Sequence, residues 1–217
     1  MDNRMDLCWL PFLGEPISEE ADTPQKMARV ELEQGKRALG LNEHIRLALD
    51  TALGEGYRIT QEGGETVISG GETGLLYGVY QLLMARRAAI APEEGEQQPR
   101  YALRMLDLWD NMTGDVERGY AGRSLLFTNN AFAYDRARVL QLGRMLASVG
   151  INVLCINNVN VVHPAEELIG RYLPQTAELA ALLRRFGVRL MVSVDYAMPT
   201  YGTLSTADPL DADVDDF

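Results

Sequence analysis

The chain has 217 residues, of which 47% are hydrophobic, a composition typical of a globular protein. Its formal net charge of −11 excludes nucleic acid as the expected partner, because phosphate binding requires clustered lysine and arginine. No apolar run approaches the roughly 18 residues that a membrane span needs, and the opening residues do not form a signal peptide. Cys8 and Cys155 lie far apart, which favours reduced thiols over a disulfide or zinc site. We therefore predict a soluble, cytoplasmic protein without a membrane partner.

The first part of the chain has the pattern of a small α/β unit, a sheet backed by helices. Residues 22–39 and 75–86 have apolar positions at helical spacing, and Asp22-Thr23-Pro24 is a typical helix start. The expected strands alternate apolar with other residues and occupy 45–49, 57–59 and 66–68. Glycines in the gap between the last two strands favour a hairpin turn.

A polar, proline-containing segment, residues 91–100, is predicted to be a linker or long surface loop. We place the domain boundary there, with a first domain over 1–98 and a second over 99–217. The second domain alternates strand, helix, strand, helix and strand, and a glycine closes each helix. The expected strands are 101–108, 151–156 and 188–194, and the expected helices are 135–149 and 174–186. Residues 151–156 form a continuous apolar run, as expected for a strand buried on both faces, and 188–194 is predicted to be another buried strand.

This order predicts a parallel sheet built from right-handed crossovers, either doubly wound or the start of a (β/α)8 barrel. A barrel needs about 250 residues, and fewer than half of that number follow Tyr101. The chain would also stop without a helix to cover its third strand, Val188–Val194, leaving an unpaired edge. The fold prediction is therefore a small α/β domain followed by the first three β/α units of an incomplete TIM barrel.

Polar residues follow each expected strand of the second domain, where both fold types place their ligands. Trp109-Asp110-Asn111 follows the first strand, and Asn157-Asn158-Val159 follows the second. A tryptophan beside such side chains is what a sugar site uses, with a ring face for the pyranose and polar groups for its hydroxyls. An equally open interpretation is that Trp109 plugs the barrel mouth while Asp110 and Asn111 cap a loop.

Three carboxylates at strand ends, Asp110, Glu117 and Asp195, could form the pair that a glycosidase needs. Inverting enzymes hold the two carboxyl groups about 6.5–9.5 Å apart, and retaining enzymes about 5–5.5 Å. Sequence supplies no such distance.

A longer motif carries a family resemblance. LRMLDLWDNMTGDVERGYAGRSLLF (103–127), LASVGINVLCINNVNV (146–161), LLRRFGVRLMVSVDYAMP (182–199) and TADPLD (206–211) resemble the opening barrel segment of the glycoside hydrolase family 67 α-glucuronidases. EGYRI and GLLYGVYQLL in the first domain are similar to the N-terminal α/β domain of that family, which is related to one in β-hexosaminidases.

The resemblance implies removal of (4-O-methyl)-D-glucuronic acid from xylo-oligosaccharides, by inversion and with neither a metal nor another cofactor. Trp109 and Val159 match the positions that form an apolar pocket around the 4-O-methyl group. The matching polar positions at the same mouth are Asp110, Asn111, Asn157 and Asn158. The general acid and the water-activating carboxylates would fall beyond Phe217, so we expect no catalytic residue in this chain and no activity from it alone.

One departure from the family pattern is visible, since relatives usually carry Asn-His where Asp107-Leu108 stands here. The expected partner is a glucuronic-acid-substituted xylo-oligosaccharide, and the oligomeric state stays open, with a homodimer of the full-length form as one option. Two alternatives remain: a non-catalytic carbohydrate-binding remnant, and a fragment of another TIM-barrel glycosidase that shares the N-terminal domain.

Overall fold

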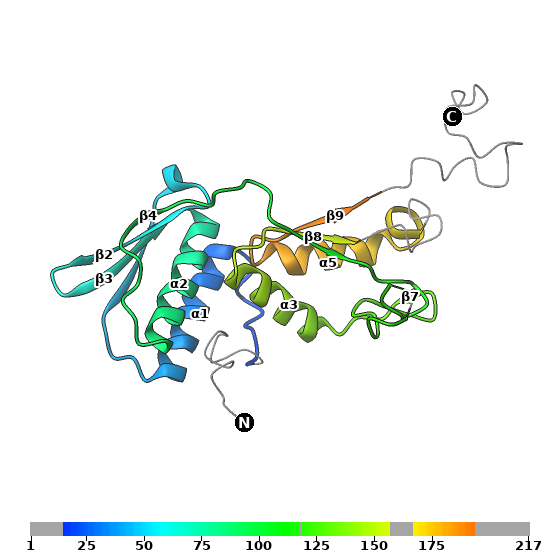
Figure 1. Cartoon of the computed structure of the whole chain (residues 1–217), viewed down its shortest axis with the longest axis horizontal. Coiled ribbons are helices and arrows are strands. Elements are labelled where there is room, and N and C mark those ends of the chain that lie inside the picture. The colour runs from blue at the N-terminus through cyan, green and yellow to red at the C-terminus, as the bar shows by residue number, and fades with distance from the viewer. Residues whose placement is uncertain (1–14, 118, 157–166, 194–217) are drawn as a thin grey trace, which may run out of the picture. The chain divides into compact units, whose positions relative to one another are not determined.

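The computed structural model describes residues 15–117, 119–156 and 167–193 (Figure 1). Its contacts divide the chain into two compact units. Unit 1 comprises Met1–Leu106, Asp135–Leu154 and Glu178–Leu190, and unit 2 comprises Asp107–Tyr134, Cys155–Ala177 and Met191–Phe217. Each unit is therefore assembled from three separate stretches of sequence.

A four-stranded sheet of order β1-β3-β2-β4 lies in unit 1. Strands β1 and β3 run parallel, whereas β2 pairs antiparallel with both β3 and β4. Gly63 and Gly64 join β2 to β3 with φ angles of 60° and 87°, so the predicted hairpin has a two-residue turn that needs left-handed backbone at both positions. The strands are β1 (Ile45–Leu49), β2 (Tyr57–Glu62), β3 (Glu65–Gly70) and β4 (Gly95–Gln97), with a short 3₁₀ turn η2 (Thr51–Leu53) after β1.

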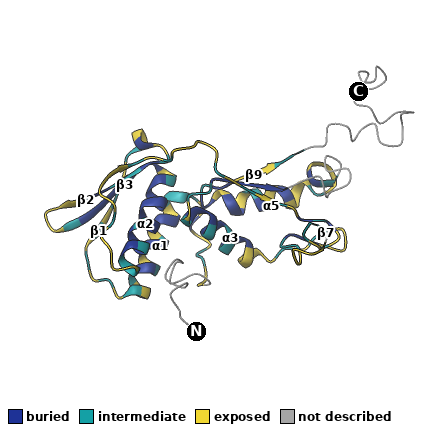
Figure 2. Cartoon of the chain, in the orientation of Figure 1, coloured by how far each residue is buried: buried dark blue, intermediate teal, exposed yellow. Residues whose placement is uncertain are grey.

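Helix α2 (Glu72–Arg87) packs on this sheet against β1, β2 and β3, and α1 (Pro24–Leu39) packs on α2 (Figure 1). The Thr23 hydroxyl accepts a hydrogen bond from the backbone N–H of Lys26 at 3.3 Å, and Pro24 opens α1, which confirms the predicted helix start. Most of α2 is buried (Figure 2). Gly74 permits its close approach, since a Cβ there would lie 1.9 Å from the carbonyl oxygen of Gly56.

Helix α3 (Arg136–Ser148) also belongs to unit 1 and packs against α2. Asp135 caps its N-terminus by accepting from the backbone N–H groups of Ala137 and Arg138, and Gly150 follows its C-terminus at φ 76°. The ending predicted from the sequence is therefore confirmed.

An ion pair lies in the core of unit 1. Arg144 of α3 and Glu31 of α1 are both fully buried and form two bonds of 2.9 Å, and Tyr80 of α2 donates to the same carboxylate at 3.1 Å. The arginine also donates to side-chain oxygens of Gln34 and Gln141. Three helices thus meet at one satisfied charged cluster inside an otherwise apolar core.

A second sheet has the order β5-β8-β9 and short strands, namely β5 (Met105–Leu108), β8 (Val153–Ile156) and β9 (Arg189–Val192). Every residue of β8 is buried, as predicted for a central strand. The prediction that β9 is also fully buried was wrong, because its residues alternate between exposed and half-buried and Met191 is 44% exposed. The reason is position: β9 is the last strand in this sheet order.

Unit 2 contains the loop that follows β5, the short hairpin β6 (Phe127–Thr128) and β7 (Ala131–Phe132), and the π-helical turn η4 (Glu167–Arg171). Phe132 packs against Phe127 at 4.7 Å between ring centroids and edge-on against Tyr134 and Tyr172 at 5.9 and 5.8 Å. These four rings form an aromatic cluster in unit 2, in which Phe127 is buried. Helix α5 (Leu173–Arg184) begins in this unit, and Gly187 follows it with φ 75°, as predicted.

The segment 91–100 is not only a loop, since Gly95–Gln97 forms the edge strand β4 through backbone pairing with β2, which no side-chain pattern announces. The strand expected over 101–108 is shorter and begins at Met105. In the described part of the chain no helix combines the length and apolar character of a membrane span.

Candidate functional site

Trp109 leaves strand β5 at the start of a compact loop over 109–126, which lies within unit 2. Its side chain is 46% exposed, and its indole N–H donates to Asp107 Oδ2 at 3.2 Å. Its carbonyl oxygen accepts from the backbone N–H of Glu117 at 2.7 Å. The ring is therefore held at a fixed place in the loop while much of its surface stays open to a ligand.

Asp110 is the internal anchor of this loop. Its side chain is only 2% exposed, and Oδ2 accepts from the Ser124 hydroxyl at 2.6 Å and from the backbone N–H groups of Leu125 and Leu126 at 3.1 and 3.3 Å. A carboxylate that satisfies three donors is strongly held, because each of these bonds is charge-assisted. Asp110 therefore joins the two ends of the loop that begins at Trp109 and stabilises its closed conformation.

Asn111 is half-buried and uses its side-chain N–H to donate to the backbone carbonyl of Glu117. Its own backbone N–H donates to the carbonyl of Asp115 at 2.8 Å. Isolated bridges pair Asp110 with Val116 and Asp115 with Arg123, so the loop folds back on itself twice. The polar residues next to Trp109 therefore hold the loop in a single arrangement.

The loop also exposes a second aromatic ring, Tyr120, which is 72% accessible. Its hydroxyl donates to Glu117 Oε1 at 2.9 Å, and that bond to a carboxylate raises the pKa of Tyr120. Glu117 itself has a φ of 56°, an uncommon backbone conformation for a residue with a side chain. An exposed ring beside a carboxylate gives the loop the mixed character that sugar-binding surfaces use.

A polar cluster joins the ends of the three strands of the second sheet. Cys155 of β8 makes hydrogen bonds with Asp107 of β5 and with Ser193, directly after β9, and all three residues belong to unit 2. Burial, and then the nearby Asp107 carboxylate, raises the pKa of the Cys155 thiol, so this cysteine stays protonated. Sequence reasoning treated Cys155 only as a buried thiol, although its place at a strand end beside Asp107 was a usable signal.

Other predicted site residues are outside the described part of the chain, namely Asn157, Asn158, Val159 and Asp195. The structure thus brings Trp109, Asp110, Asn111 and Glu117 together in one loop.

The arrangement is that of an α/β protein with an aromatic and polar loop at the end of a sheet strand. Its fold is similar to that of a GH138 enzyme targeting pectin rhamnogalacturonan II, with a TM-score of 0.54 at 17% identity, covering 78% of this chain and 30% of that one. A likeness at this identity shows the α/β fold alone.

The sequence comparisons are more specific. Residues 83–217, more than half of the chain, match the glycosyl hydrolase family 67 middle domain, and the chain belongs to that family. It is 38% identical over 157 residues to a probable alpha-glucuronidase A of Aspergillus clavatus, covering 71% of this chain and 18% of that protein. It is 35% identical over 181 residues to alpha-glucuronidase A of Aspergillus tubingensis, covering 80% and 21%. The chain therefore spans about a fifth of the length of these curated relatives.

Proposed function

We propose that this chain is part of an α-glucuronidase that removes (4-O-methyl)-D-glucuronic acid from xylo-oligosaccharides during xylan breakdown, with inversion at the anomeric carbon. The observation that carries the proposal is the half-exposed Trp109, fixed on a hydrogen-bonded loop at a strand end in a member of family 67. The names of the relatives support glucuronic acid as the sugar that is recognised.

Trp109 has the chemistry to bind one face of the uronic acid, with Val159 completing an apolar pocket around the methyl group. A half-exposed indole contributes apolar area at little cost in side-chain entropy, because few torsions must be fixed. Asn157 and Asn158 are proposed to bind sugar hydroxyls. Asp110 and Asn111 act on the substrate through the loop that they hold, since their side-chain groups already bond within it.

The proposed domain organisation is an N-terminal α/β domain over 1–98 and the first part of a (β/α)8 barrel over 99–217. In that arrangement the general acid and the water-activating carboxylates belong to later barrel strands than those of this chain. We therefore expect the 217-residue chain to bind substrate and not to hydrolyse it, since inverting hydrolysis requires two carboxyl groups across the scissile bond. Cytoplasmic location and a homodimer of the full-length form stay predictions.

The test measures two properties of the 217-residue chain with aldotetraouronic acid as the probe. Calorimetry should detect saturable binding that Trp109→Ala abolishes, whereas Tyr101→Ala, which truncates another exposed ring outside the loop, should leave binding unchanged. Absence of binding by a folded chain, or equal binding by the two variants, would reject the assignment of Trp109.

The second measurement is glucuronic acid release, assayed for the chain and for the product of the continuous reading frame past Phe217, if there is one. Release by the longer product and none by the chain supports the enzyme proposal. Binding without release by either product would favour a non-catalytic carbohydrate-binding protein instead.

A further inference from the structure

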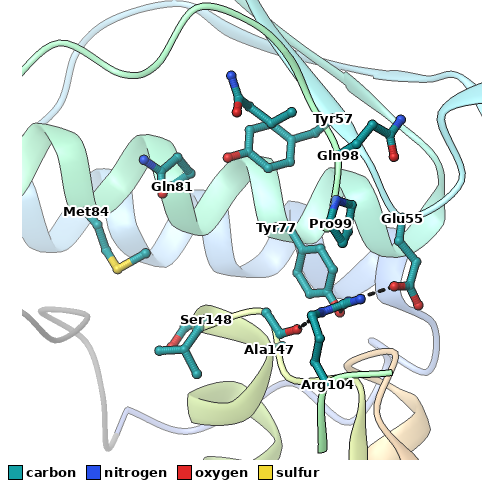
Figure 3. Close-up of a pocket in the computed structure, with 13 residues that line it drawn as sticks. Glu55, Tyr57, Tyr77, Gln81, Met84, Gln98, Pro99, Arg104, Ala147 and Ser148 are labelled. Atoms are coloured by element: carbon teal, nitrogen blue, oxygen red, sulfur yellow. Dashed lines mark hydrogen bonds and ion pairs between the residues drawn. The ribbon is translucent and has the colours of Figure 1, made fainter. Parts of the chain in front are cut away.

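A cavity of about 450 Å³ opens in unit 1 (Figure 3). All of its lining residues belong to that unit, and none belongs to the loop 109–126 that carries Trp109. Its volume falls within the range of roughly 300–1,000 Å³ that small-molecule pockets occupy. The role proposed above for the Trp109 loop leaves this cavity without a function.

One wall of the cavity is a single face of helix α2. Tyr77, Gln81 and Met84 follow one another at spacings of four and three residues, which places them along the same side of a helix. Figure 3 shows these side chains along the cavity, and the ring of Tyr57 from β2 lies against the same helix, where a Cβ at Gly78 would come within 3.2 Å of it. Two tyrosine rings and a thioether thus give the cavity apolar surface of the kind on which a pyranose ring packs.

Hydrogen-bonding groups in this cavity are still available to a ligand. Among the described residues, neither the Tyr57 hydroxyl nor the Gln81 side-chain amide has a hydrogen-bond partner, although both side chains are half-buried. Burial of the Tyr57 ring raises the pKa of its hydroxyl, so the group remains a donor at neutral pH. Gln98 lies on the same side and is fixed by donating to the carbonyl of Leu53 at 3.2 Å. Amide and hydroxyl groups together offer both donors and acceptors.

The charges at the cavity neutralise each other. Arg104 donates to Glu55 at 2.7 Å and to the Tyr77 hydroxyl at 3.3 Å, and Asn152 donates to both oxygens of the same glutamate at 3.2 Å. This closed network holds Tyr77 in place and presents no unpaired charge to a ligand. A phosphate or carboxylate would find no free cation among the described residues that line the cavity, whereas a neutral polyhydroxylated ligand needs none.

We propose that this cavity is a second carbohydrate-binding site, which takes a neutral oligosaccharide against the two tyrosines and binds its hydroxyls through Tyr57 and Gln81. Xylotetraose is the first probe, a choice that rests on the proposed function, and cellotetraose is the second. The site would hold an unsubstituted stretch of a sugar chain, in contrast to the uronic acid expected at Trp109.

The experiment titrates the 217-residue chain with each neutral tetrasaccharide by calorimetry. Gln81→Ala and Tyr57→Phe should each weaken binding about fivefold, the effect of one lost neutral hydrogen bond. Gln25→Ala on α1 and Tyr101→Phe, at an exposed position outside the loop 109–126, are the matched controls, because they remove the same groups from positions that do not line the cavity, and they should leave binding unchanged. Circular dichroism establishes that each variant is folded.

The outcomes separate this site from the proposed function. Binding of either tetrasaccharide that is weakened by the two cavity variants and unaffected by Trp109→Ala supports the second site. No binding of either probe by the folded chain, or binding that Trp109→Ala abolishes and the cavity variants do not change, overturns it. Binding of aldotetraouronic acid through Trp109 is measured in a separate titration, so the cavity proposal and the proposed function can each be rejected without the other.

Discussion

The two compact units each bury an acidic side chain, and they compensate it in different ways. In unit 1 Glu31 is paired with Arg144, and a tyrosine adds one more donor. In unit 2 the donors to Asp110 Oδ2 are neutral, namely one serine hydroxyl and two backbone N–H groups. The first arrangement joins three helices of a packed core, whereas the second shapes a single loop. A buried carboxylate therefore serves tertiary packing in one unit and local folding in the other.

Burial dominates the behaviour of the first acid. It raises the pKa of Glu31 although the guanidinium of Arg144 opposes the shift. The pair thus resides where a charge is costly, and its stability depends on both partners remaining present. The loop of unit 2 depends instead on hydrogen-bond geometry, which substitutions can change without leaving an unpaired charge.

The largest expected effect is that of Arg144→Ala, which leaves Glu31 buried without its cation. The free energy of unfolding should fall by about 3–5 kcal/mol, as when other buried ion pairs lose one partner. Urea unfolding at neutral pH measures the change, and Arg138→Ala, an exposed arginine on the same helix, is the control. A loss below about 1 kcal/mol would show that the cluster does not hold the three helices together.

Asp110→Ala should have the next largest effect, about 2–3 kcal/mol, because it leaves the hydroxyl of Ser124 and the N–H of Leu125 without their acceptor and takes from the buried Leu126 N–H one of its two acceptors. Amide hydrogen exchange should accelerate at Leu125 and Leu126 and remain slow in the core of unit 1. Asp115→Ala, at an exposed position of the same loop, provides the control. Faster exchange throughout unit 1 would contradict the local role assigned to this carboxylate.

A smaller, pH-dependent effect is expected at Glu43, whose carboxylate accepts two bonds from Arg86 at 2.8 and 2.9 Å. The hydrogen bond to Arg86 lowers the pKa of Glu43 below its ordinary value of 4.5. Because the folded-state pKa is the lower one, the stabilisation is complete above 4.5 and disappears as the pH falls through the folded-state pKa.

Glu43→Gln should accordingly cost about 1 kcal/mol at about pH 7, at the upper end for a partly exposed pair. The difference from the parent chain should vanish in strongly acidic solution. Urea unfolding at about pH 7 and about pH 3.5 measures it, and a difference that does not shrink on acidification would reject the ion pair as its source.

The smallest stability effect should be that of Trp109→Ala, about 0.5 kcal/mol or less, because the residue is half-exposed. Thermal unfolding of Trp109→Ala and of Asp110→Ala, each compared with the parent chain, measures how far the two stability losses differ within one loop. A loss as large as that of Asp110→Ala would mean that the tryptophan plugs a core, the interpretation that competed with a sugar site.

Much of unit 1 could be predicted from local patterns. The apolar spacing of α1 and α2, the Thr23-Pro24 helix start and the paired glycines of the β2–β3 turn each depend on neighbouring residues alone. The edge strand β4 escaped prediction because it is held by backbone pairing with β2, and its own side chains are polar. The exposure of β9 escaped for a related reason, since burial depends on which strands lie next to it.

For the candidate site, the sequence by itself determined that Trp109, Asp110 and Asn111 are adjacent at a strand end and that the motif belongs to a family 67 protein. Only the tertiary structure decided which of these neighbours is exposed and which is buried. The tryptophan is half-exposed, whereas the aspartate is buried and accepts a hydrogen bond from Ser124. The cavity on α2 likewise joins β2, α2 and residues 147–150. Burial and hydrogen-bond partners depend on contacts between residues far apart in the chain, and these contacts exist only once the chain has folded.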